Sequence, residues 1–293
     1  MSYLFERFTI LKMGPNITYV ESQKLPMPLL HLLILAIIQG ITEFLPISSS
    51  GHLILLPSLT GIEDQGQLID VSVHIGTLGA VILYFWTDSK MAFVGLAHIT
   101  KGRLKTPAAR IATLLILATI PAISFGLFLK VTGLSDHLRS ITVIAWTMLI
   151  FGIILYVADQ RGKGVKTQVD WNTADAIKLG LWQAISLIPG TSRSGISITG
   201  ARVLGYTRED GTKISMLMSI PVIIASGILL GAEALANADA ASIRDGAYAA
   251  IFAFFAALLA LSLMMRLLRR ISFTPYVIYR LILGIILLGI AYS

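Results

Sequence analysis

The chain has 293 residues, of which 55% are hydrophobic and only 13% are charged, and its mean hydropathy is +0.79. A soluble domain carries roughly 25% charged residues, so the polar surface is too small to keep this chain in water. The composition excludes a cytosolic enzyme, a coiled coil and a disordered chain, and it indicates an integral membrane protein. Because cysteine is absent, thiolate metal sites and cysteine nucleophiles are also excluded.

The first 28 residues are more polar than the rest of the chain. They lack the basic start, the short apolar core and the small-residue cleavage site of a signal peptide. We interpret residues 1–28 as an N-terminal extension without an assigned role, and residues 29–292 as a single membrane domain.

Long apolar runs follow, each with about the 17–25 residues that cross a bilayer as a helix. Six spans are predicted, at 68–86, 111–131, 141–158, 214–234, 247–265 and 275–292. Two further apolar stretches, 29–61 and 173–205, are each interrupted by a turn of Pro, Gly and hydroxyl residues. Because Pro and Gly break helices and hydroxyls cap them, we interpret these two stretches as broken helices or hairpins.

The loops between the spans differ in charge. Lys and Arg are concentrated in four of them, 87–110, 159–172, 206–213 and 266–274, whereas 132–140 and 235–246 hold one arginine each. The positive-inside rule places the first four in the cytoplasm and the last two outside. This distribution explains the net charge of +7 without a nucleic-acid partner, so we expect the bilayer as partner and no nucleic acid. It also makes 173–205 enter from the cytoplasmic face and 29–61 from the outer face.

The two broken stretches resemble each other. A shift of 144 residues aligns, without a gap, the pairs Gln39 and Gln183, Ile41 and Ile185, Ser48 and Ser192, Ser50 and Ser194, Gly51 and Gly195, and Gly61 and Gly205. We therefore predict an inverted-topology repeat with halves at about 29–158 and about 173–292, whose functional centre lies where the broken helices meet. The expected fold is an all-α polytopic membrane protein with six transmembrane helices plus two oppositely oriented re-entrant helix hairpins.

Ionisable side chains gather at the first turn, and at membrane depth such groups are costly and usually functional. Glu43 and His52 flank this turn, and Gln39 shares a helix face with Glu43 because the two are four residues apart. A neutral His52 would serve as a base or as an orienting group. An Mg²⁺ or Ca²⁺ ion bridging Glu43 and a phosphate is compatible with the pattern, although no cluster of carboxylates and histidines predicts it.

The same turn holds three consecutive serines, Ser48, Ser49 and Ser50. A helix starting near Ser50, capped by Ser48 or Ser49, would aim free amides and a positive dipole end at the turn. Such a helix start suits an anion such as phosphate. The alternative is that these serines only cap the helix.

The second turn repeats the hydroxyl-rich pattern and adds Arg193, flanked by Thr191, Ser192 and Ser194. A guanidinium matches phosphate with two hydrogen bonds and stays charged when dehydrated. The alternative is a bare ion pair between Arg193 and Glu43 that joins the hairpins.

Other polar and aromatic residues in the spans receive lesser roles. We expect His74 and Asp70 to pack near the site or at the interface. Arg202 and Arg280 are expected to snorkel to the membrane surface. Trp86, Trp171 and Tyr276 are expected to be interfacial anchors.

With both turns considered, the chain resembles the undecaprenyl-diphosphate phosphatase, or bacitracin-resistance protein, family of bacteria. The resemblance rests on a first motif that runs from Gln39 through Glu43 and the serines to His52. It also rests on a second motif that runs from Pro189 to Ser194 and continues with Ser197, and it covers most of 29–292. Two positions depart from the family pattern: Gln39 replaces a second glutamate found in some members, and Ser197 replaces the usual threonine.

The resemblance implies hydrolysis of a polyprenyl diphosphate to the monophosphate in the bacterial plasma (inner) membrane, which recycles the lipid carrier for cell-wall synthesis and confers bacitracin resistance. It implies that Glu43 and His52 are catalytic, that Ser49 is the nucleophile and that Arg193 binds phosphate. The remaining motif positions are expected to bind substrate: Gln39, Ser48, Ser50, Thr191, Ser192, Ser194 and Ser197. A divalent cation, Mg²⁺ or Ca²⁺, is the expected cofactor, and a homodimer is one alternative for the assembly.

Our hypothesis is therefore phosphoryl transfer at the lipid–water boundary. Arg193 and helix amides neutralise the diphosphate, Ser49 or a water molecule attacks, and His52 and Glu43 handle the proton. The alternative is a secondary transporter or lipid flippase, because inverted repeats with broken helices are typical of transporters. The grouping of Ser49, His52 and Glu43 favours the enzyme, since transport requires neither a nucleophile nor a base.

Overall fold

The computed structural model describes residues 8–9, 20–21, 29–49, 51–53, 65–134, 138–236 and 238–293. Two short strands, β1 (Phe8–Thr9) and β2 (Val20–Glu21), pair antiparallel within the predicted N-terminal extension. The rest of the regular structure in the described ranges is helical. The helices are α1 (Leu29–Phe44), α3 (Gln67–Tyr84), α4 (Trp86–Thr100), α5 (Pro107–Thr132), α7 (Ile141–Arg161), the 3-10 turn η1 (Gln168–Asp170), α8 (Thr173–Ile185), α9 (Arg193–Val203), α10 (Arg208–Ala236), α11 (Ala240–Leu267) and α12 (Thr274–Tyr292).

Six helices in the described part of the chain are long and apolar enough to cross a membrane: α3, α5, α7, α10, α11 and α12. Each overlaps one of the predicted spans, so the expectation of an all-α, multi-pass membrane protein with six candidate spans is confirmed. Large apolar side chains such as Ile153, Phe255 and Ile285 are exposed on these helices, as lipid-facing positions require.

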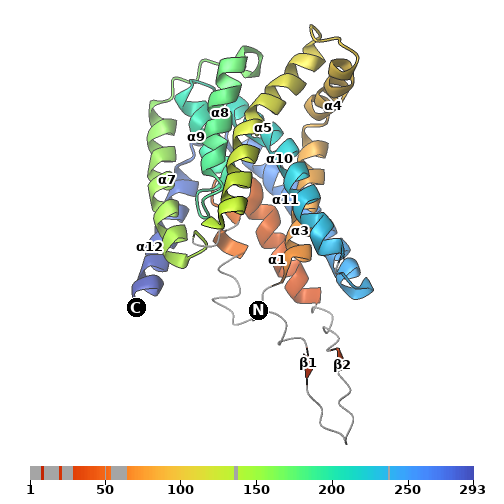
Figure 1. The fold of residues 1–293 in the computed structure, drawn as a ribbon. Helices are drawn as coiled ribbons and strands as arrows, with labels where there is room; N and C mark the ends of the chain where they lie inside the picture. Colours follow the sequence, from red (N-terminus) through yellow and green to blue (C-terminus); the bar gives the residue numbers. More distant parts are fainter. Residues whose placement is uncertain are drawn as a thin grey trace, which may run out of the picture.

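The loops sort to opposite ends of the bundle, as their charges predict. In Figure 1 the connections from α4 to α5 and from α7 to α8 lie at the upper end, and both are rich in Lys and Arg. The connection from α5 to α7 and the C-terminus lie at the lower end. The upper end is therefore the one that the positive-inside rule assigns to the cytoplasm.

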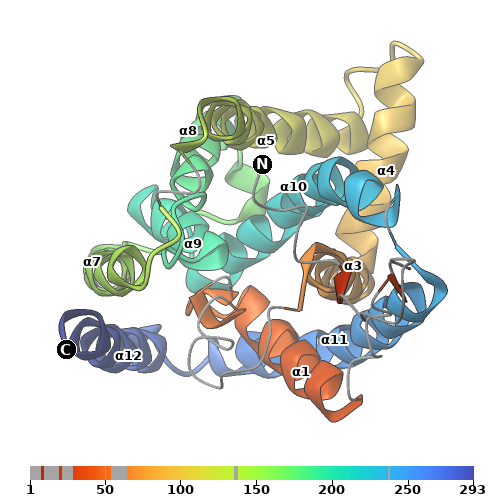
Figure 2. The same cartoon turned by 60° about the horizontal axis from the view of Figure 1, so that its bottom comes forward.

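Of the three helices in the two broken stretches, α9 is the one that lies among other helices. Helix α9 packs against α7, α8 and α10, while α1 packs against α11 and α3. Figures 1 and 2 show the C-terminal end of α1 approaching the N-terminal end of α9. Every residue from 194 to 202 in α9 is buried, although the helix is rich in Ser, Thr and Gly. Small side chains let its backbone lie close to the neighbouring helices.

The segment 87–110 was predicted as a loop, and this prediction is wrong for its first part, because α4 covers Trp86–Thr100. Helix α4 packs against α5 through Gly95, where an added Cβ would lie 2.1 Å from the carbonyl oxygen of Ala108. The helix is stabilised by this close tertiary contact, which a search for long apolar runs does not detect. Trp86 at its start is 56% exposed, which agrees with an interfacial anchor.

A buried carboxylate, Asp159 at the end of α7, joins four helices near the upper end of the bundle. It accepts two hydrogen bonds from Arg208 on α10, at 2.7 and 3.1 Å, and one at 3.2 Å from the amide of Phe273 before α12. The Nε atom of Arg202 on α9 lies 3.2 Å from it. Arg202 also donates to the carbonyl oxygen of Gly162, at 2.9 Å. The prediction that Arg202 snorkels to the surface is therefore wrong, because its charge is satisfied inside the protein.

A second polar cluster lies at the same end. Asp175 accepts hydrogen bonds from Lys166 at 2.9 Å and from the Tyr206 hydroxyl at 2.7 Å. Burial, together with the bond to Asp175, raises the pKa of Tyr206 above its usual value, so its hydroxyl stays protonated and donates. Trp171 is fully buried beside this region, so the prediction that it is an interfacial anchor is wrong.

We expect Asp159→Ala to lower the melting temperature of the purified protein in detergent. Removing one partner of a buried ion pair typically costs about 3–5 kcal/mol, because the remaining guanidinium of Arg202 stays buried without its counter-charge. The matched control is Glu209→Ala, since the Glu209 carboxylate is 46% exposed and lies 3.6 Å from Arg269. An exposed pair contributes about 0–1 kcal/mol. Equal melting temperatures for the two variants would contradict the role assigned to Asp159.

Candidate functional site

An ion pair joins the two turns that the sequence places 150 residues apart. Arg193 Nη2 donates to Glu43 Oε1 at 2.6 Å, and the two side chains are only 14% and 5% exposed. Glu43 lies in the last turn of α1 and Arg193 is the first residue of α9. The meeting of the two helix ends therefore brings opposite charges together in a region from which water is largely excluded.

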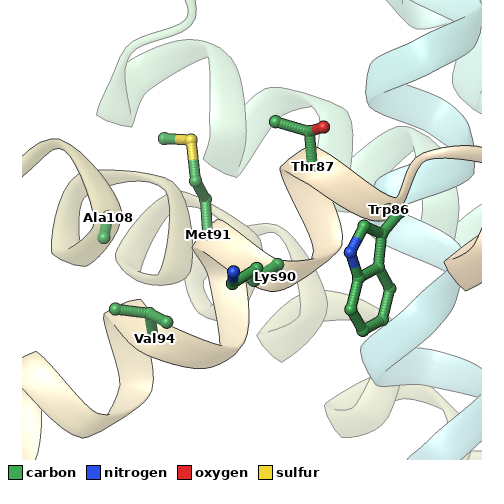
Figure 3. Close-up of a pocket in the computed structure, with 6 residues that line it drawn as sticks. All are labelled: Trp86, Thr87, Lys90, Met91, Val94 and Ala108. Atoms are coloured by element: carbon green, nitrogen blue, oxygen red, sulfur yellow. The ribbon is translucent and has the colours of Figure 1, made fainter.

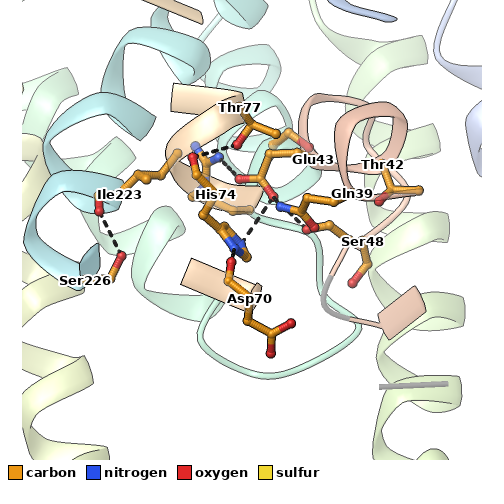
Figure 4. A network of polar contacts seen from close by, with 12 residues as sticks. Gln39, Thr42, Glu43, Ser48, Asp70, His74, Thr77, Ile223 and Ser226 are labelled. Carbon is orange, nitrogen blue, oxygen red and sulfur yellow. Dashed lines mark hydrogen bonds and ion pairs between the residues drawn. The ribbon is translucent and has the colours of Figure 1, made fainter. Parts of the chain in front are cut away.

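The second oxygen of Glu43 is the centre of a polar network (Figure 4). Oε2 accepts hydrogen bonds from Ser49 Oγ at 2.7 Å and from Gln39 Nε2 at 2.9 Å, and it lies 3.7 Å from His74 Nε2. His74 Nδ1 lies 2.7 Å from the carbonyl oxygen of Asp70, so this nitrogen carries a proton and donates. Nε2 becomes a donor to Glu43 only when the ring is doubly protonated. The hydroxyl of Ser49, the predicted nucleophile, thus donates its proton in a hydrogen bond to the Glu43 carboxylate.

His52 is hydrogen-bonded at both of its ring nitrogens. Its Nδ1 lies 2.6 Å from the carbonyl oxygen of Ser48, and its Nε2 lies 2.5 Å from the hydroxyl of Tyr279 on α12. Within the described residues, no hydrogen bond joins His52 to Ser49. The predicted grouping of Ser49, His52 and Glu43 therefore separates into a bonded pair, Ser49 with Glu43, and a histidine bound to other partners.

Each turn contains a serine in the left-handed region of backbone conformation, Ser48 with φ 76° and Ser192 with φ 72°. This conformation is uncommon for residues other than glycine. Ser48 Oγ accepts from the amide of Gly51 at 3.3 Å, and Ser192 Oγ accepts from the amide of Gly195 at 3.1 Å. Ser48, rather than Ser49, is therefore the cap of the first turn. Ser192 Oγ satisfies one of the first amides of α9, and the other first amides of this helix have no intrahelical acceptors, which suits an anion.

The other predicted substrate-binding hydroxyls differ in their partners. Ser194 Oγ donates to the carbonyl oxygen of Leu45 at 2.9 Å, so this hydroxyl links the second turn to the first. Thr191 Oγ1 and Ser197 Oγ are buried and have no hydrogen-bond partner among the described residues, and the same holds for Arg193 Nη1. Buried polar atoms are normally satisfied, so Arg193 Nη1 is a donor available to a ligand. Ser50 lies outside the described residues.

The sequence matches the family described as bacitracin resistance protein BacA over residues 32–286. The chain belongs to this family. A protein named undecaprenyl-diphosphatase from Ruegeria pomeroyi is 68% identical over 267 residues, which cover 91% of this chain and 100% of the relative. A protein of the same name from Jannaschia sp. is 66% identical with the same coverage. Undecaprenyl-diphosphatase 1 from Rhodospirillum rubrum is 43% identical over 272 residues, with 91% and 96% of the two chains covered.

Arg280 holds both turns of this BacA-family protein from α12. It is fully buried and donates to the carbonyl oxygens of Met148, Pro46, Thr147 and Gly190, at 3.2, 3.3, 3.3 and 3.2 Å respectively. The prediction that Arg280 snorkels to the surface is therefore wrong. Its charge is surrounded by carbonyl dipoles, and its bonds to Pro46 and Gly190 satisfy one backbone carbonyl in each turn.

Three residues that contact the site were missed or given minor roles in the sequence analysis. His74 and Arg280 are ionisable residues inside otherwise apolar spans, a signal that by itself predicts function or a buried partner. Tyr279 carries no such signal, because tyrosine is common near span ends. Its contact with His52 depends on how α12 packs beside the first turn.

The site does not form a cage for a resident metal ion. The described residues include no group of three or more His, Asp or Glu side chains that would hold one. Both oxygens of Glu43 already accept bonds, from Arg193 on one side and from Ser49 and Gln39 on the other. The residues present therefore do not fit a metal ion bound by protein ligands alone.

A pocket of about 320 Å³ lies elsewhere, between α4 and the start of α5 (Figure 3). It is lined by Trp86, Thr87, Lys90, Met91, Val94 and Ala108. None of these residues belongs to the two motifs, and the lining contains no carboxylate or imidazole. This pocket is therefore not the candidate site.

We expect Arg280→Lys to destabilise the protein although it keeps the charge. Lysine is a compact point charge that does not match the geometry of four carbonyl oxygens on three segments. Hydrogen bonds from a charged donor contribute about 1.5–3 kcal/mol each, so losing one or two lowers stability by about 3 kcal/mol. The control is Arg244→Lys, whose guanidinium is 53% exposed and pairs with the adjacent Asp245. The measurement is the melting temperature in detergent, and an unchanged value for Arg280→Lys contradicts this role.

Proposed function

We propose that this protein hydrolyses undecaprenyl diphosphate, or a similar polyprenyl diphosphate, to the monophosphate and inorganic phosphate. The full-length similarity to proteins named undecaprenyl-diphosphatase supports this activity. The observation that carries it is the buried Glu43 carboxylate, which binds the Arg193 guanidinium at 2.6 Å and the Ser49 hydroxyl at 2.7 Å. The carboxylate, as a base, thus contacts both a phosphate-binding cation and a nucleophile.

The first step of the proposed reaction is binding of the diphosphate headgroup. The free Nη1 donor of Arg193 binds the terminal phosphate, while Nη2 stays with Glu43. The amides that open α9 bind further phosphate oxygens, with the positive end of the helix dipole behind them. Stabilising negative charge on the transferring group supplies much of the catalysis in phosphoryl transfer.

The second step is attack on the terminal phosphorus. The Oγ atom of Ser49 forms a bond to phosphorus, its proton passes to Glu43 Oε2, and the bridging P–O bond breaks to release the polyprenyl monophosphate. Water then attacks the phosphorus of the phosphoserine and passes a proton to His52 Nε2, while the Ser49 Oγ–P bond breaks. Ser49 Oγ recovers its proton from Glu43, and inorganic phosphate leaves. The alternative is that water attacks directly, with Glu43 as its base.

We further propose that the two broken stretches are re-entrant hairpins related by an inverted repeat within one membrane domain, 29–292. Helix α1 has 16 residues, about 24 Å at 1.5 Å per residue, which is less than the hydrocarbon thickness of about 30 Å. Helices α8 and α9 are shorter still. The caps Ser48 and Ser192 have the same backbone conformation at positions related by the predicted shift, which supports the repeat.

The membrane is, in this proposal, the bacterial inner membrane, where the reaction recycles the lipid carrier for cell-wall synthesis and confers bacitracin resistance. The polyprenyl tail lies against the apolar helix surface. Assembly as a homodimer stays a prediction from the sequence resemblance.

We also propose that the reaction requires a divalent cation, and the residues at the site indicate how this cation would bind. Because the protein residues alone do not form a metal cage, Mg²⁺ or Ca²⁺ arrives bound to the diphosphate as part of the substrate. We expect excess EDTA to lower phosphate release at least tenfold, and added Mg²⁺ or Ca²⁺ to restore it. EDTA-treated wild type whose activity is unchanged would show that no divalent cation is required.

We expect Arg193→Ala and Glu43→Gln each to lower phosphate release from a polyprenyl diphosphate in detergent by about 10²–10³-fold, as loss of a charge-stabilising group typically does. The control is Arg161→Ala, which removes an exposed cation at the end of α7. Ser49→Ala is expected to lower the rate by at least as much if serine is the nucleophile, and to retain more activity if water attacks. A transporter would release no phosphate at all, so inactive wild type, or fully active Arg193→Ala and Glu43→Gln, contradicts the proposed function.

A further inference from the structure

Both ring nitrogens of His52 are bound, and the two partners define its protonation. The carbonyl oxygen of Ser48 only accepts hydrogen bonds, so Nδ1, 2.6 Å away, is the nitrogen that carries the proton. In a neutral imidazole the lone pair is then on Nε2. The Tyr279 hydroxyl, 2.5 Å from Nε2, donates to it. The nitrogen that the proposed reaction uses as a base is therefore held by a tyrosine that belongs to neither sequence motif.

The ring of Tyr279 also fixes the plane of the imidazole. The two ring centroids are 5.7 Å apart and the planes differ by 9°, so the rings are nearly parallel. The adjacent residue, Arg280, is fully buried and donates to the carbonyl oxygen of Pro46 in the first turn. This bond ties α12 to the turn, so the position of Tyr279 relative to His52 is set by a buried contact.

We propose that Tyr279 is a positioning residue for the phosphatase reaction, which acts by hydrogen bonding to Nε2 and so fixing the orientation of the His52 ring, whose tautomer is set by the carbonyl oxygen of Ser48. A hydroxyl both donates and accepts, so it stabilises the ring before and after protonation: it donates to neutral Nε2, and after rotation it accepts from Nε2–H. Other residues that orient a catalytic imidazole also do so through a hydrogen bond to one of its ring nitrogens. The inference rests on the proposed function, because it requires His52 to take part in the reaction.

The test compares Tyr279→Phe with wild type. This variant keeps the aromatic ring and removes only the hydroxyl. Because Tyr279 is 42% exposed, the fold is expected to tolerate the substitution. We expect kcat to fall about 5–20-fold with KM changed less than twofold, because the diphosphate is bound by Arg193 rather than by Tyr279. The matched control is Tyr276→Phe, one turn earlier on α12, since the Tyr276 hydroxyl has no hydrogen bond within the described residues and its removal is expected to leave kcat unchanged.

A second measurement distinguishes an effect of Tyr279 on the orientation of the His52 ring from an effect on the stability of the protein. In ¹⁵N-histidine NMR spectra, with the His52 signal assigned by its loss in His52→Gln, wild type is expected to show one tautomer protonated at Nδ1. Tyr279→Phe is expected to keep this tautomer and to shift the Nε2 resonance, because Nε2 loses its hydrogen-bond donor. An unchanged His52 signal and an unchanged kcat in Tyr279→Phe would overturn the inference.

His52→Gln distinguishes failure of the inference from failure of the proposed function. If His52→Gln loses activity, and adding Tyr279→Phe to it causes no further loss, the two residues act as one unit and the inference is supported. If His52→Gln loses activity while Tyr279→Phe retains it, the inference is wrong and the phosphatase proposal stands. If His52→Gln keeps full activity, His52 takes no part in catalysis and Tyr279 has nothing to position.

Discussion

Polar backbone inside a membrane must be satisfied by the protein, because lipid tails offer no hydrogen bonds. The two turns of this protein break helices in the middle of the bundle, so their carbonyl oxygens need internal donors. Arg280 supplies these donors to both turns at once, and Ser194 adds a bond from the second turn to Leu45 in the first. The site can be polar at this depth because a buried cation on α12 stabilises its backbone.

The same arrangement explains why Glu43 is ionised and ordered. Its carboxylate is nearly inaccessible, and a buried charge is tolerated only when it is paired and hydrogen-bonded. Arg193, Ser49 and Gln39 provide those partners, from both turns and from its own helix. In the proposed reaction, a diphosphate that binds to Arg193 enters a site where Ser49 is already hydrogen-bonded to Glu43. In the proposed reaction, this preorganised charge is the contribution of the protein.

Much of the fold could be predicted from hydropathy and charge. The six spans were recovered because a bilayer imposes length and apolarity on any helix that crosses it, and the basic loops were recovered because charge distribution follows topology. Helix α4 was missed because it is held by a close contact at Gly95 rather than by an apolar run. Arg202, Arg280 and Trp171 were assigned to the membrane surface because a snorkelling or interfacial side chain and one with a buried partner look alike in sequence.

The residue types of the two motifs alone predict the chemistry: Glu43, Arg193 and the serines of the two turns indicate phosphate binding and transfer whatever their arrangement. Their partners depend on packing. Hydrogen bonds extend only about 3 Å, so a change in how α1, α9 and α12 meet would exchange one acceptor for another without altering the sequence pattern. Tertiary structure therefore decided that the Ser49 proton is held by Glu43, and that His52 binds Ser48 and Tyr279 instead.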